Sequence, residues 1–471
     1  MIEPRIVKEL QNLVGKKYVL TSPEDLVAYS YDGTFAERRP DVVVSPDSTE
    51  QVSRILGLAW REEIPVVPRG MASGLAAASV PIHGGIVLNL CRMNRILEID
   101  ELNFTATVEA GVVTQDLADA VAKKGLFYPP DPSSIKQSTL GGNAACNAGG
   151  PRCLKYGVTS DYVRGLTVVL ADGRVVKTGG KAIKNVTGYN LTQLFVGSEG
   201  TLGVITELLL KLIPLPKVAR TAKAVFPRLA DASQCVNRIL TAGITPATIE
   251  LMDETAIATI EEAMHLGLPL DVEAILIIES DGMDEQQVNQ EIEAIADICR
   301  VTGAREVQVA HSEKERNDLW SARRAISPSL ARRAPNKLGE DISVPRSAIP
   351  EAVAAIKEIS RQVGIPIAIF GHAGDGNLHP NILFDRRDPV QVEKMKKAAA
   401  EIFGVALRLG GTLSGEHGVG SFKRAFVEQD VGPIFVDVMN QIKKALDPKN
   451  ILNPGKVIPG PAPGGRDLSV W

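Results

Sequence analysis

Hydrophobic and polar positions follow two different patterns along the chain, and the change falls near residue 217. In the first half, apolar runs at residues 41–44 and 65–68 flank a stretch at 49–63 whose apolar positions recur with helical spacing. This pattern predicts a strand, a helix and a second strand.

Further along the first half, turn residues separate several short apolar runs. Residues 166–170 and 174–177 flank Ala-Asp-Gly and predict a hairpin. Residues 85–90 and 96–111 are expected to form another hairpin, followed by a helix at 114–124.

The second half predicts strands and helices in the order of a ferredoxin-like split unit, β-α-β followed by β-α-β. The predicted elements are strand 221–226, helix 229–242, strand 247–251, strand 274–279, helix 284–302 and strand 306–310. The expected fold class is therefore α+β.

A polar turn between two apolar runs, residues 371–381 (GHAGDGNLHPN), is the first candidate for chemistry. With Asp-Gly at 375–376 as a two-residue hairpin loop, His372 is expected to face His379 directly. Opposed residues have Cβ atoms roughly 4.5–5.5 Å apart, a separation that suits two imidazoles sharing one cation. Asn381 is expected on the same face.

A second polar cluster at residues 414–418 offers a carboxylate, Glu416, and a third imidazole, His417. A lone histidine at a strand end is more often a hydrogen-bonded structural residue than a ligand. Two opposed histidines beside a Glu-His pair instead favour a metal site. Two imidazoles and one carboxylate leave coordination positions open, as catalytic metal sites do.

Three glycine-bearing sets, at residues 69–75, 139–150 and 197–203, are candidates for cofactor binding. The first follows a strand, where backbone N–H groups can converge on phosphate oxygens, although an ordinary tight turn looks the same. The second is rich in Gly, Ala and Asn, which favours backbone packed against a flat ligand over a flexible linker.

A basic stretch follows the capping box at residues 312–315. Such a charge run is usually a solvated helix face. Trp320 precedes Arg323 by three residues, however, and an anchored Arg323 can bind a carboxylate with two parallel hydrogen bonds.

Composition excludes several functions. The 471 residues are enough for two or three domains, 44% of them hydrophobic and only 4% aromatic. Few aromatics and a net charge of -4 argue against nucleic-acid binding. The five cysteines form no CxxC pair, which argues against a disulfide framework or an iron–sulfur cluster. Without a signal core or an 18-residue apolar run, a cytoplasmic chain with no membrane span is expected.

The segments PPDPSSIKQSTLGGNAACNAGG, VTGYNLTQLFVGSEGTLGVIT, GHAGDGNLH, SGEHGVG and NILNPGK together closely resemble one family. It is that of the FAD-linked D-2-hydroxy-acid dehydrogenases of the vanillyl-alcohol-oxidase superfamily, which includes glycolate oxidase subunits and flavin D-lactate dehydrogenases. The likeness runs from about residue 37 to residue 456.

The resemblance implies an FAD-binding domain of two α/β subdomains of the p-cresol-methylhydroxylase (PCMH) type and a ferredoxin-like cap with a C-terminal helical segment. The expected division is an N-terminal helical segment 1–36, FAD domain 37–216, cap domain with the metal site 217–430, a segment 431–458 associated with the FAD domain, and a flexible tail 459–471.

The resemblance also implies non-covalent FAD, with its pyrophosphate loop at residues 69–75. The family usually has Gly-Thr where Ala72-Ser73 stands; Ser73 keeps a hydroxyl, whereas Ala72 is less free at positive φ. The residues expected to contact FAD are Arg69, Gly70, Met71, Ala72, Ser73, Gly74, Leu75, Pro130, Asp131, Ser138, Gly141, Gly142, Asn143, Asn147, Gly149, Gly150, Glu199, Gly200, Gly203, Ile205 and Asn453.

Position by position, the resemblance implies that His372, His379 and Glu416 are metal ligands and that His417 is the base. Asn381 matches a substrate-contacting asparagine. Arg323 resembles the arginine that holds the substrate carboxylate, and Lys337 corresponds to a lysine with the same task at a spacing shifted by about one residue. The metal is expected to be Zn, Mn or Fe(II).

The implied reaction is oxidation of a small D-2-hydroxy acid, with the Cα hydride passing to flavin N5 and electrons leaving to a separate acceptor. An electron-transferring flavoprotein, an iron–sulfur subunit or a quinone would serve as acceptor, and a homodimer is possible for the family. The alternatives are a non-redox flavoenzyme resembling alkyl-glycerone-phosphate synthase, and a non-catalytic flavin subunit.

Overall fold

The computed structural model describes residues 2–460, so most of the predicted tail 459–471 lies outside the described residues. The chain forms two compact units. Among the described residues, unit 1 contains 2–149, 158–214 and 416–460, and unit 2 contains 150–157 and 215–415.

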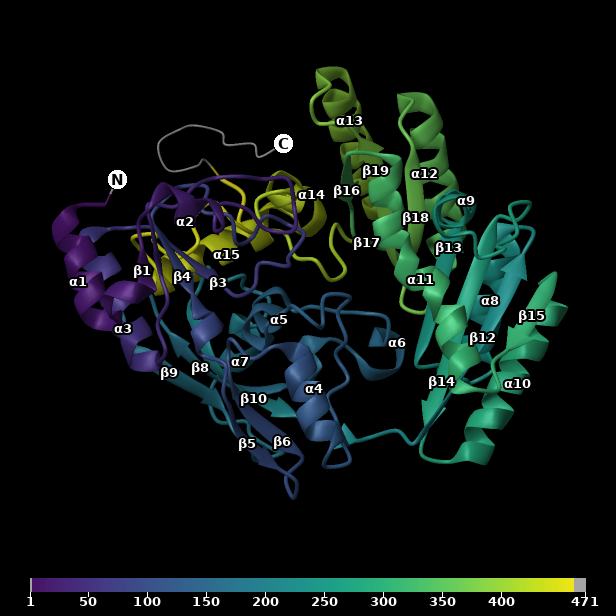
Figure 1. Cartoon of the computed structure of the whole chain (residues 1–471), viewed down its shortest axis with the longest axis horizontal. Coiled ribbons are helices and arrows are strands. Elements are labelled where there is room, and N and C mark those ends of the chain that lie inside the picture. The colour runs from purple at the N-terminus through teal and green to yellow at the C-terminus, as the bar shows by residue number, and fades with distance from the viewer. Residues whose placement is uncertain (1, 461–471) are drawn as a thin grey trace. The chain divides into compact units, whose positions relative to one another are not determined.

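Three sheets form the framework of unit 1 (Figure 1). The first has the order β1-β2-β4-β3, with β2, β3 and β4 parallel; the second is antiparallel, with the order β5-β6-β10-β8-β9; and β11 pairs with β7. The strands are β1 (Val19–Leu20), β2 (Val42–Val44), β3 (Val66–Arg69), β4 (Ile86–Asn89), β5 (Ile96–Asp100), β6 (Thr105–Glu109), β7 (Leu126–Phe127), β8 (Val163–Val169), β9 (Val175–Gly179), β10 (Val204–Lys211) and β11 (Ile213–Pro214).

Helices of unit 1 come from both ends of the chain. They are α1 (Pro4–Val14), α2 (Pro23–Val27), α3 (Thr49–Glu62), α4 (Thr114–Ala122), α5 (Leu140–Cys146), α7 (Leu191–Phe195), α14 (Val427–Val431) and α15 (Pro433–Leu446), with short 3₁₀ turns η1 (Lys16–Tyr18), η2 (Leu90–Arg92), η3 (Thr159–Asp161) and η5 (Arg424–Phe426). The predicted strand-helix-strand unit is confirmed as β2, α3 and β3.

One predicted hairpin is present and the other is wrong. Strands β8 and β9 pair antiparallel, as predicted. Residues 96–111 do not form one strand beside β4: they fold back on themselves as β5 and β6, which pair with each other. The turn between them, at 101–104, contains the apolar residues Leu102 and Phe104 and no Gly or Pro, so it carries no turn signal in the sequence.

Unit 2 is built on an eight-stranded sheet with the order β15-β12-β14-β13-β18-β19-β16, and β17 pairs with β19. The strands are β12 (Val218–Phe226), β13 (Thr248–Asp253), β14 (Ala274–Gly282), β15 (Glu306–Val309), β16 (Asn336–Gly339), β17 (Ile342–Ser343), β18 (Ile367–His372) and β19 (Asn377–Phe384). Strands β15, β12, β14 and β13 stand in the order of a ferredoxin-like unit, as predicted, and the hairpin β18–β19 extends this sheet at the β13 edge.

Two layers of helices pack on this sheet. Helices α10, α8, α12 and α13 contact one another in that order, and α12 and α13 run beside β18 and β19 (Figure 1). Helices α9 and α11 contact each other and share a core with Met252, Ile277 and Phe370. The helices are α6 (Cys153–Tyr156), α8 (Leu229–Thr241), α9 (Glu254–Met264), α10 (Glu285–Val301), α11 (Glu313–Arg333), α12 (Ile349–Val363) and α13 (Pro389–Arg408), with a 3₁₀ turn η4 (Arg346–Ala348).

The short segment 150–157 belongs to unit 2 through polar contacts with β14. Lys155 Nζ donates to Asp281 Oδ1 at 2.6 Å, and Tyr156 Oη donates to the same carboxylate at 2.8 Å. In the described part of the chain, residues 2–460, no helix is both long enough and apolar enough to cross a membrane.

A buried carboxylate joins the start of α9 to the central hairpin of unit 2. Asp253 Oδ1 accepts hydrogen bonds from the backbone N–H groups of Ala256 and Ile369, at 2.8 and 3.1 Å. Asp253 is fully buried, and this burial raises its pKa from 3.8 to about 7. The folded chain therefore holds a proton on Asp253 that the unfolded chain releases near pH 4.

This shift predicts that the protonated Asp253 carboxyl stabilises the folded chain. The stabilisation is complete below pH 4 and is lost as the pH rises through 7. Asp253→Asn keeps a neutral capping oxygen. We expect the unfolding free energy of wild type, relative to Asp253→Asn, to fall by about 2–4 kcal/mol between pH 4 and pH 8, measured by urea unfolding.

Asp284→Asn is the matched control, because Asp284 caps α10 at an exposed position. The difference in unfolding free energy between Asp284→Asn and wild type should change little over this pH range. If the difference between Asp253→Asn and wild type is also constant, Asp253 does not hold the proton assigned to it.

Candidate functional site

The predicted hairpin at 371–381 is present, but its register differs from the prediction. His372 pairs with Asn377 and Phe370 pairs with His379, so the loop has four residues, not two. Direct opposition of His372 and His379 is therefore wrong. Gly376 packs against Val344, where a Cβ would meet the carbonyl oxygen at 2.0 Å, and the N–H groups of residues 375 and 376 both donate to the His372 carbonyl.

The two histidines still share one face of the sheet, because the register differs by two residues and a shift of two preserves the alternation. They are diagonal neighbours whose rings meet edge to face at 84°, with Nε2 atoms 3.4 Å apart. His372 is 2% exposed and His379 is 5% exposed. The hairpin thus brings together two buried imidazoles with their Nε2 atoms in contact.

Glu250, a residue the sequence analysis missed, lies beside His372 on the neighbouring strand β13. Its Oε1 is 2.5 Å from His372 Nδ1, and its Oε2 accepts from Arg323 Nε at 2.5 Å. Burial favours the protonated form of this fully buried carboxyl, but Arg323 and His372 outweigh it and hold the pKa of Glu250 at about 2. Glu250 is therefore ionised at neutral pH.

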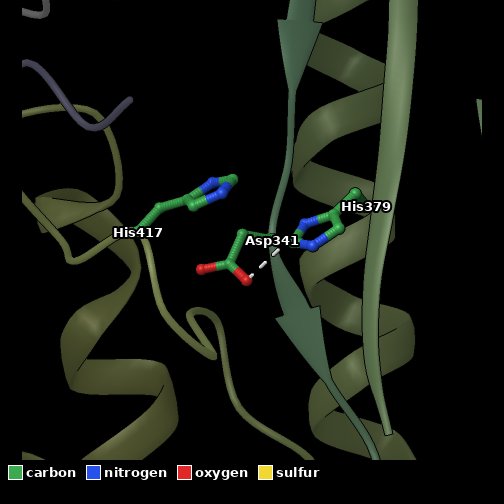
Figure 2. Close-up of side chains that lie close together, drawn as sticks. All are labelled: Asp341, His379 and His417. Atoms are coloured by element: carbon green, nitrogen blue, oxygen red, sulfur yellow. Dashed lines mark ion pairs between the residues drawn. The ribbon is translucent and has the colours of Figure 1, made fainter. Parts of the chain in front are cut away.

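A second carboxylate, Asp341, lies beside His379. Its Oδ1 is 3.9 Å from His379 Nδ1, the ion pair that Figure 2 marks with a dashed line. Asn377 Nδ2 donates to Asp341 Oδ1 at 2.6 Å and Ser414 Oγ donates to Oδ2 at 2.8 Å. Each imidazole thus has a carboxylate on its Nδ1 side and the other imidazole on its Nε2 side.

The other predicted substrate residues of unit 2 lie on the same face of the sheet. Asn381 is buried, two residues after His379, and donates to the His379 carbonyl at 2.8 Å. Lys337 on β16 pairs with Leu383 of β19, so it shares the face of Asn381. Lys337 Nζ donates to Ser327 Oγ at 2.6 Å, and burial lowers the pKa of Lys337.

The three predicted glycine-bearing sets surround one pocket within unit 1. The predicted cofactor residues that line it are Arg69, Gly70, Met71, Ala72, Ser73, Gly74, Leu75, Ser138, Gly141, Gly142, Asn143, Gly149, Glu199, Gly200, Gly203 and Ile205. Residues 132–134 also line the pocket, and the sequence analysis did not include them among the cofactor residues.

Close approach of a neighbouring residue explains two of the glycines. A Cβ at Gly70 would meet Thr139 Oγ1 at 2.3 Å, and a Cβ at Gly141 would meet Ala110 Cβ at 2.6 Å. Ala72 adopts the left-handed conformation at φ +53, so this loop keeps the backbone that glycine would favour although alanine stands there.

Five predicted cofactor residues do not line the pocket: Pro130, Asp131, Asn147, Gly150 and Asn453. Two of them support its walls instead. Asn147 ends α5 in the left-handed conformation and accepts from the Ser160 N–H at 2.8 Å. Asn453 Nδ2 donates to the Glu199 carbonyl at 2.7 Å.

Glu416 and His417 begin the C-terminal part of unit 1 and line the same pocket. Buried Glu199 holds the loop that follows them, because its carboxylate accepts from the N–H groups of Val419 and Gly420 at 2.7 and 2.8 Å. Burial raises the pKa of Glu199, and these two hydrogen bonds oppose the rise. Burial also disfavours the charged form of Lys456 and lowers its pKa to about 7.

The sequence gives a signal for only one of the two missed carboxylates. Asp341 follows Glu340 in the short connection between β16 and β17, where this acidic pair is visible in the sequence. Glu250 lies inside the buried strand β13, and the contacts that identify it come from β18 and α11.

Comparison with known proteins identifies the family. Residues 215–457 match "FAD linked oxidases, C-terminal domain" and residues 40–179 match "FAD binding domain". The chain is 47% identical to glycolate oxidase subunit GlcD of Bacillus subtilis over 458 residues, 97% of each chain. It is 38% identical to the Escherichia coli K12 subunit of the same name, covering 96% of this chain and 91% of that one. It is 35% identical to D-lactate dehydrogenase of Anaerostipes hadrus, covering 97% and 98%.

Solved structures agree on the fold. p-Cresol methylhydroxylase with substrate bound superposes with a TM-score of 0.81 at 20% identity, covering 96% of each chain. Alkyldihydroxyacetonephosphate synthase superposes with a TM-score of 0.74 at 21% identity, covering 97% of this chain and 86% of that one. The chain belongs to the FAD-linked oxidase family, with the PCMH-type fold, and is an FAD-dependent oxidoreductase.

Proposed function

We propose that this oxidoreductase converts a small D-2-hydroxy acid, of the size of glycolate or D-lactate, to its 2-oxo acid with the help of a divalent cation. The observation that carries the proposal is the pair of buried imidazoles, His372 and His379, with their Nε2 atoms 3.4 Å apart. The names of the relatives, glycolate oxidase subunit and D-lactate dehydrogenase, support this substrate class.

The distance between the imidazoles fits a shared cation. Two nitrogens each about 2.0–2.1 Å from a tetrahedral zinc ion lie about 3.3 Å apart. The 3.4 Å between the Nε2 atoms of His372 and His379 matches this separation. The carboxylates of Glu250 and Asp341 lie on the Nδ1 sides, as is usual behind metal-binding histidines.

Covalent connection favours Glu416 as the third ligand. Gly415 is the last residue of unit 2 and packs so closely within it that a Cβ there would meet Asn377 Nδ2 at 2.2 Å, and Ser414 Oγ donates to Asp341. Glu416 follows by one peptide bond, so its Cα is about 3.8 Å from that of Gly415. A carboxylate on such a short tether supports the assignment of His372, His379 and Glu416 as ligands.

Substrate orientation is assigned to Arg323, Asn381 and Lys337. Arg323 donates to Glu250 through Nε, its guanidinium carbon lies 4.8 Å from the centre of the Phe370 ring, and its side chain is 13% exposed. Both terminal NH₂ groups remain available in the proposal for the substrate carboxylate, since a guanidinium suits a planar anion.

His417 is assigned as the base that takes the hydroxyl proton. An imidazole has an unperturbed pKa of about 6.5 and accepts protons near neutrality. Its position on the wall of the FAD pocket supports the assignment. When bound, FAD supplies the two-electron acceptor, and a divalent cation supplies the acidity that eases deprotonation of the substrate hydroxyl.

We further propose that the electrons leave through a separate protein. The relatives from B. subtilis and E. coli are named subunits of glycolate oxidase, which supports a partner subunit for this chain too. A cytoplasmic electron-transferring flavoprotein or iron–sulfur subunit fits this role.

The proposal predicts which acids bleach the flavin. Mixed anaerobically with a panel of D- and L-2-hydroxy acids, the protein should lose its oxidised flavin absorbance with glycolate or the D-acids. His417→Ala should slow this bleaching at least about 100-fold, because it removes the base. His311→Ala, at an exposed histidine, is the control and should react like wild type.

If no acid of the panel bleaches the flavin, the proposed reaction is wrong and a non-redox flavoenzyme, like the synthase that shares the fold, becomes the better account. A His417→Ala rate equal to wild type would overturn the base assignment alone.

Metal dependence is the second prediction. Dialysis against EDTA should abolish hydroxy-acid bleaching while the visible spectrum of bound FAD persists. Adding Zn²⁺, Mn²⁺ or Fe²⁺ should restore the rate. Unchanged bleaching after verified removal of metal would refute the metal assignment and leave the FAD assignment intact. If no hydroxy acid bleaches the flavin, and the protein still transfers electrons to an acceptor at the same rate after EDTA treatment, it is a non-catalytic flavin subunit.

A further inference from the structure

Glu250 contacts two of the residues to which the proposed function assigns roles. Oε1 meets His372 Nδ1 and Oε2 meets Arg323 Nε, both at 2.5 Å. Glu250 is 0% exposed, and its strand position is directly opposite His372 in the β13–β18 pairing. One buried carboxylate therefore lies between a proposed metal ligand and the proposed carboxylate-binding arginine.

The first contact determines which nitrogen of His372 carries hydrogen. Glu250 accepts from the Arg323 guanidinium through its other oxygen, as a carboxylate does, and a carboxylate only accepts hydrogen bonds, so the hydrogen lies on Nδ1 of His372. In the neutral imidazole, Nε2 then presents its lone pair, and it points toward His379 Nε2. The tautomer that Glu250 imposes is thus the one that can bind a cation at Nε2.

The second contact, from Arg323 Nε to Glu250 Oε2, holds the guanidinium by the nitrogen next to its aliphatic chain. Nε is held by Glu250, and the guanidinium packs over the Phe370 ring. Among residues 2–460, no hydrogen bond from either terminal NH₂ group of Arg323 to the protein accompanies this contact. The guanidinium is held at one edge, with two donors on its other edge for a carboxylate ligand.

A neighbouring carboxylate on the same face shows the structural alternative. Glu279 on β14 accepts from Thr221 Oγ1 at 2.8 Å and from Trp320 Nε1 at 3.0 Å. It is 6% exposed and touches the same helix α11 through Trp320. Glu279 binds neutral structural donors, whereas Glu250 binds a histidine and an arginine that the sequence analysis had already assigned to the site.

We propose that Glu250 is a positioning residue that fixes the tautomer of His372 and the side chain of Arg323 together, so that cation binding and substrate-carboxylate binding depend on one buried carboxylate. The inference rests on the proposed function for the roles of His372 and Arg323. Burying the Glu250 carboxylate completely is costly unless both of its oxygens are paired. Its two roles, toward His372 and toward Arg323, explain why it is buried there.

Glu250→Gln separates the two contacts. A glutamine has one oxygen, and the charged guanidinium is the stronger donor for it. The amide NH₂ is then left facing His372 Nδ1, which becomes an acceptor, and the ring hydrogen moves to Nε2. Glu279→Gln is the matched control on the same face, because Glu279 accepts from Thr221 and Trp320 instead of His372 and Arg323.

The first measurement needs no metal. In metal-free, ¹⁵N-histidine-labelled holoprotein at pH 8, the His372 signals, assigned by comparison with His372→Gln, should report hydrogen on Nδ1. Only six histidines contribute to the spectrum. Glu250→Gln should move the hydrogen to Nε2, and Glu279→Gln should leave it on Nδ1.

The second measurement is Zn²⁺ affinity of the metal-free holoprotein by competition with a chromogenic chelator. Glu250→Gln should bind Zn²⁺ about 10–100-fold more weakly than wild type, because outer carboxylates have effects of this size. Glu279→Gln should bind like wild type. FAD content and circular dichroism establish that each variant is folded.

The outcomes separate the two proposals. Hydrogen on Nε2 in wild type, or an unchanged tautomer in Glu250→Gln, overturns the inference. Equal weakening of Zn²⁺ binding by both variants also overturns it, since Glu250 would then act only through general stability. If the tautomer moves as expected but wild type binds no metal ion, the metal in the proposed function is wrong, the link from Glu250 to cation binding falls with it, and Glu250 still sets the tautomer of His372.

Discussion

The constraint on which the site depends is the burial of charge on one face of the sheet in unit 2. Glu250 is fully buried, and it is stable there as an anion only because Arg323 and His372 donate to it from two different elements. Removing one partner of such a group leaves an uncompensated buried charge, which is strongly destabilising. The pairing of β13 with β18 and the packing of α11 are therefore tied to the position of His372.

An extension of the sheet brings the two histidines to this buried carboxylate. A ferredoxin-like unit of four strands ends at β13, and the hairpin β18–β19 adds to that edge. The added hairpin carries both imidazoles, and the strand it joins supplies the carboxylate behind one of them. In unit 1, distant segments meet around one pocket because Gly70 and Gly141 have no side chain and leave room for Thr139 and Ala110.

Local patterns predicted much of this arrangement. The split β-α-β order, the hairpin carrying His372 and His379, and the three glycine-bearing sets follow from periodicity and turn residues. The exact register of the hairpin did not, because packing of Gly376 against Val344 enlarges the loop, and that contact is not local in sequence. Glu250 was missed for the same reason: within its own strand it reads as a polar exception, and only β18 and α11 give it partners.

The central claim is that His372 and His379 present their Nε2 atoms to one ion. X-ray absorption spectroscopy of the Zn²⁺-loaded holoprotein tests it most directly. The account predicts two imidazole nitrogens about 2.0–2.1 Å from the metal, with one imidazole lost in His372→Gln. A coordination shell without imidazole, or one unchanged in His372→Gln, would contradict it.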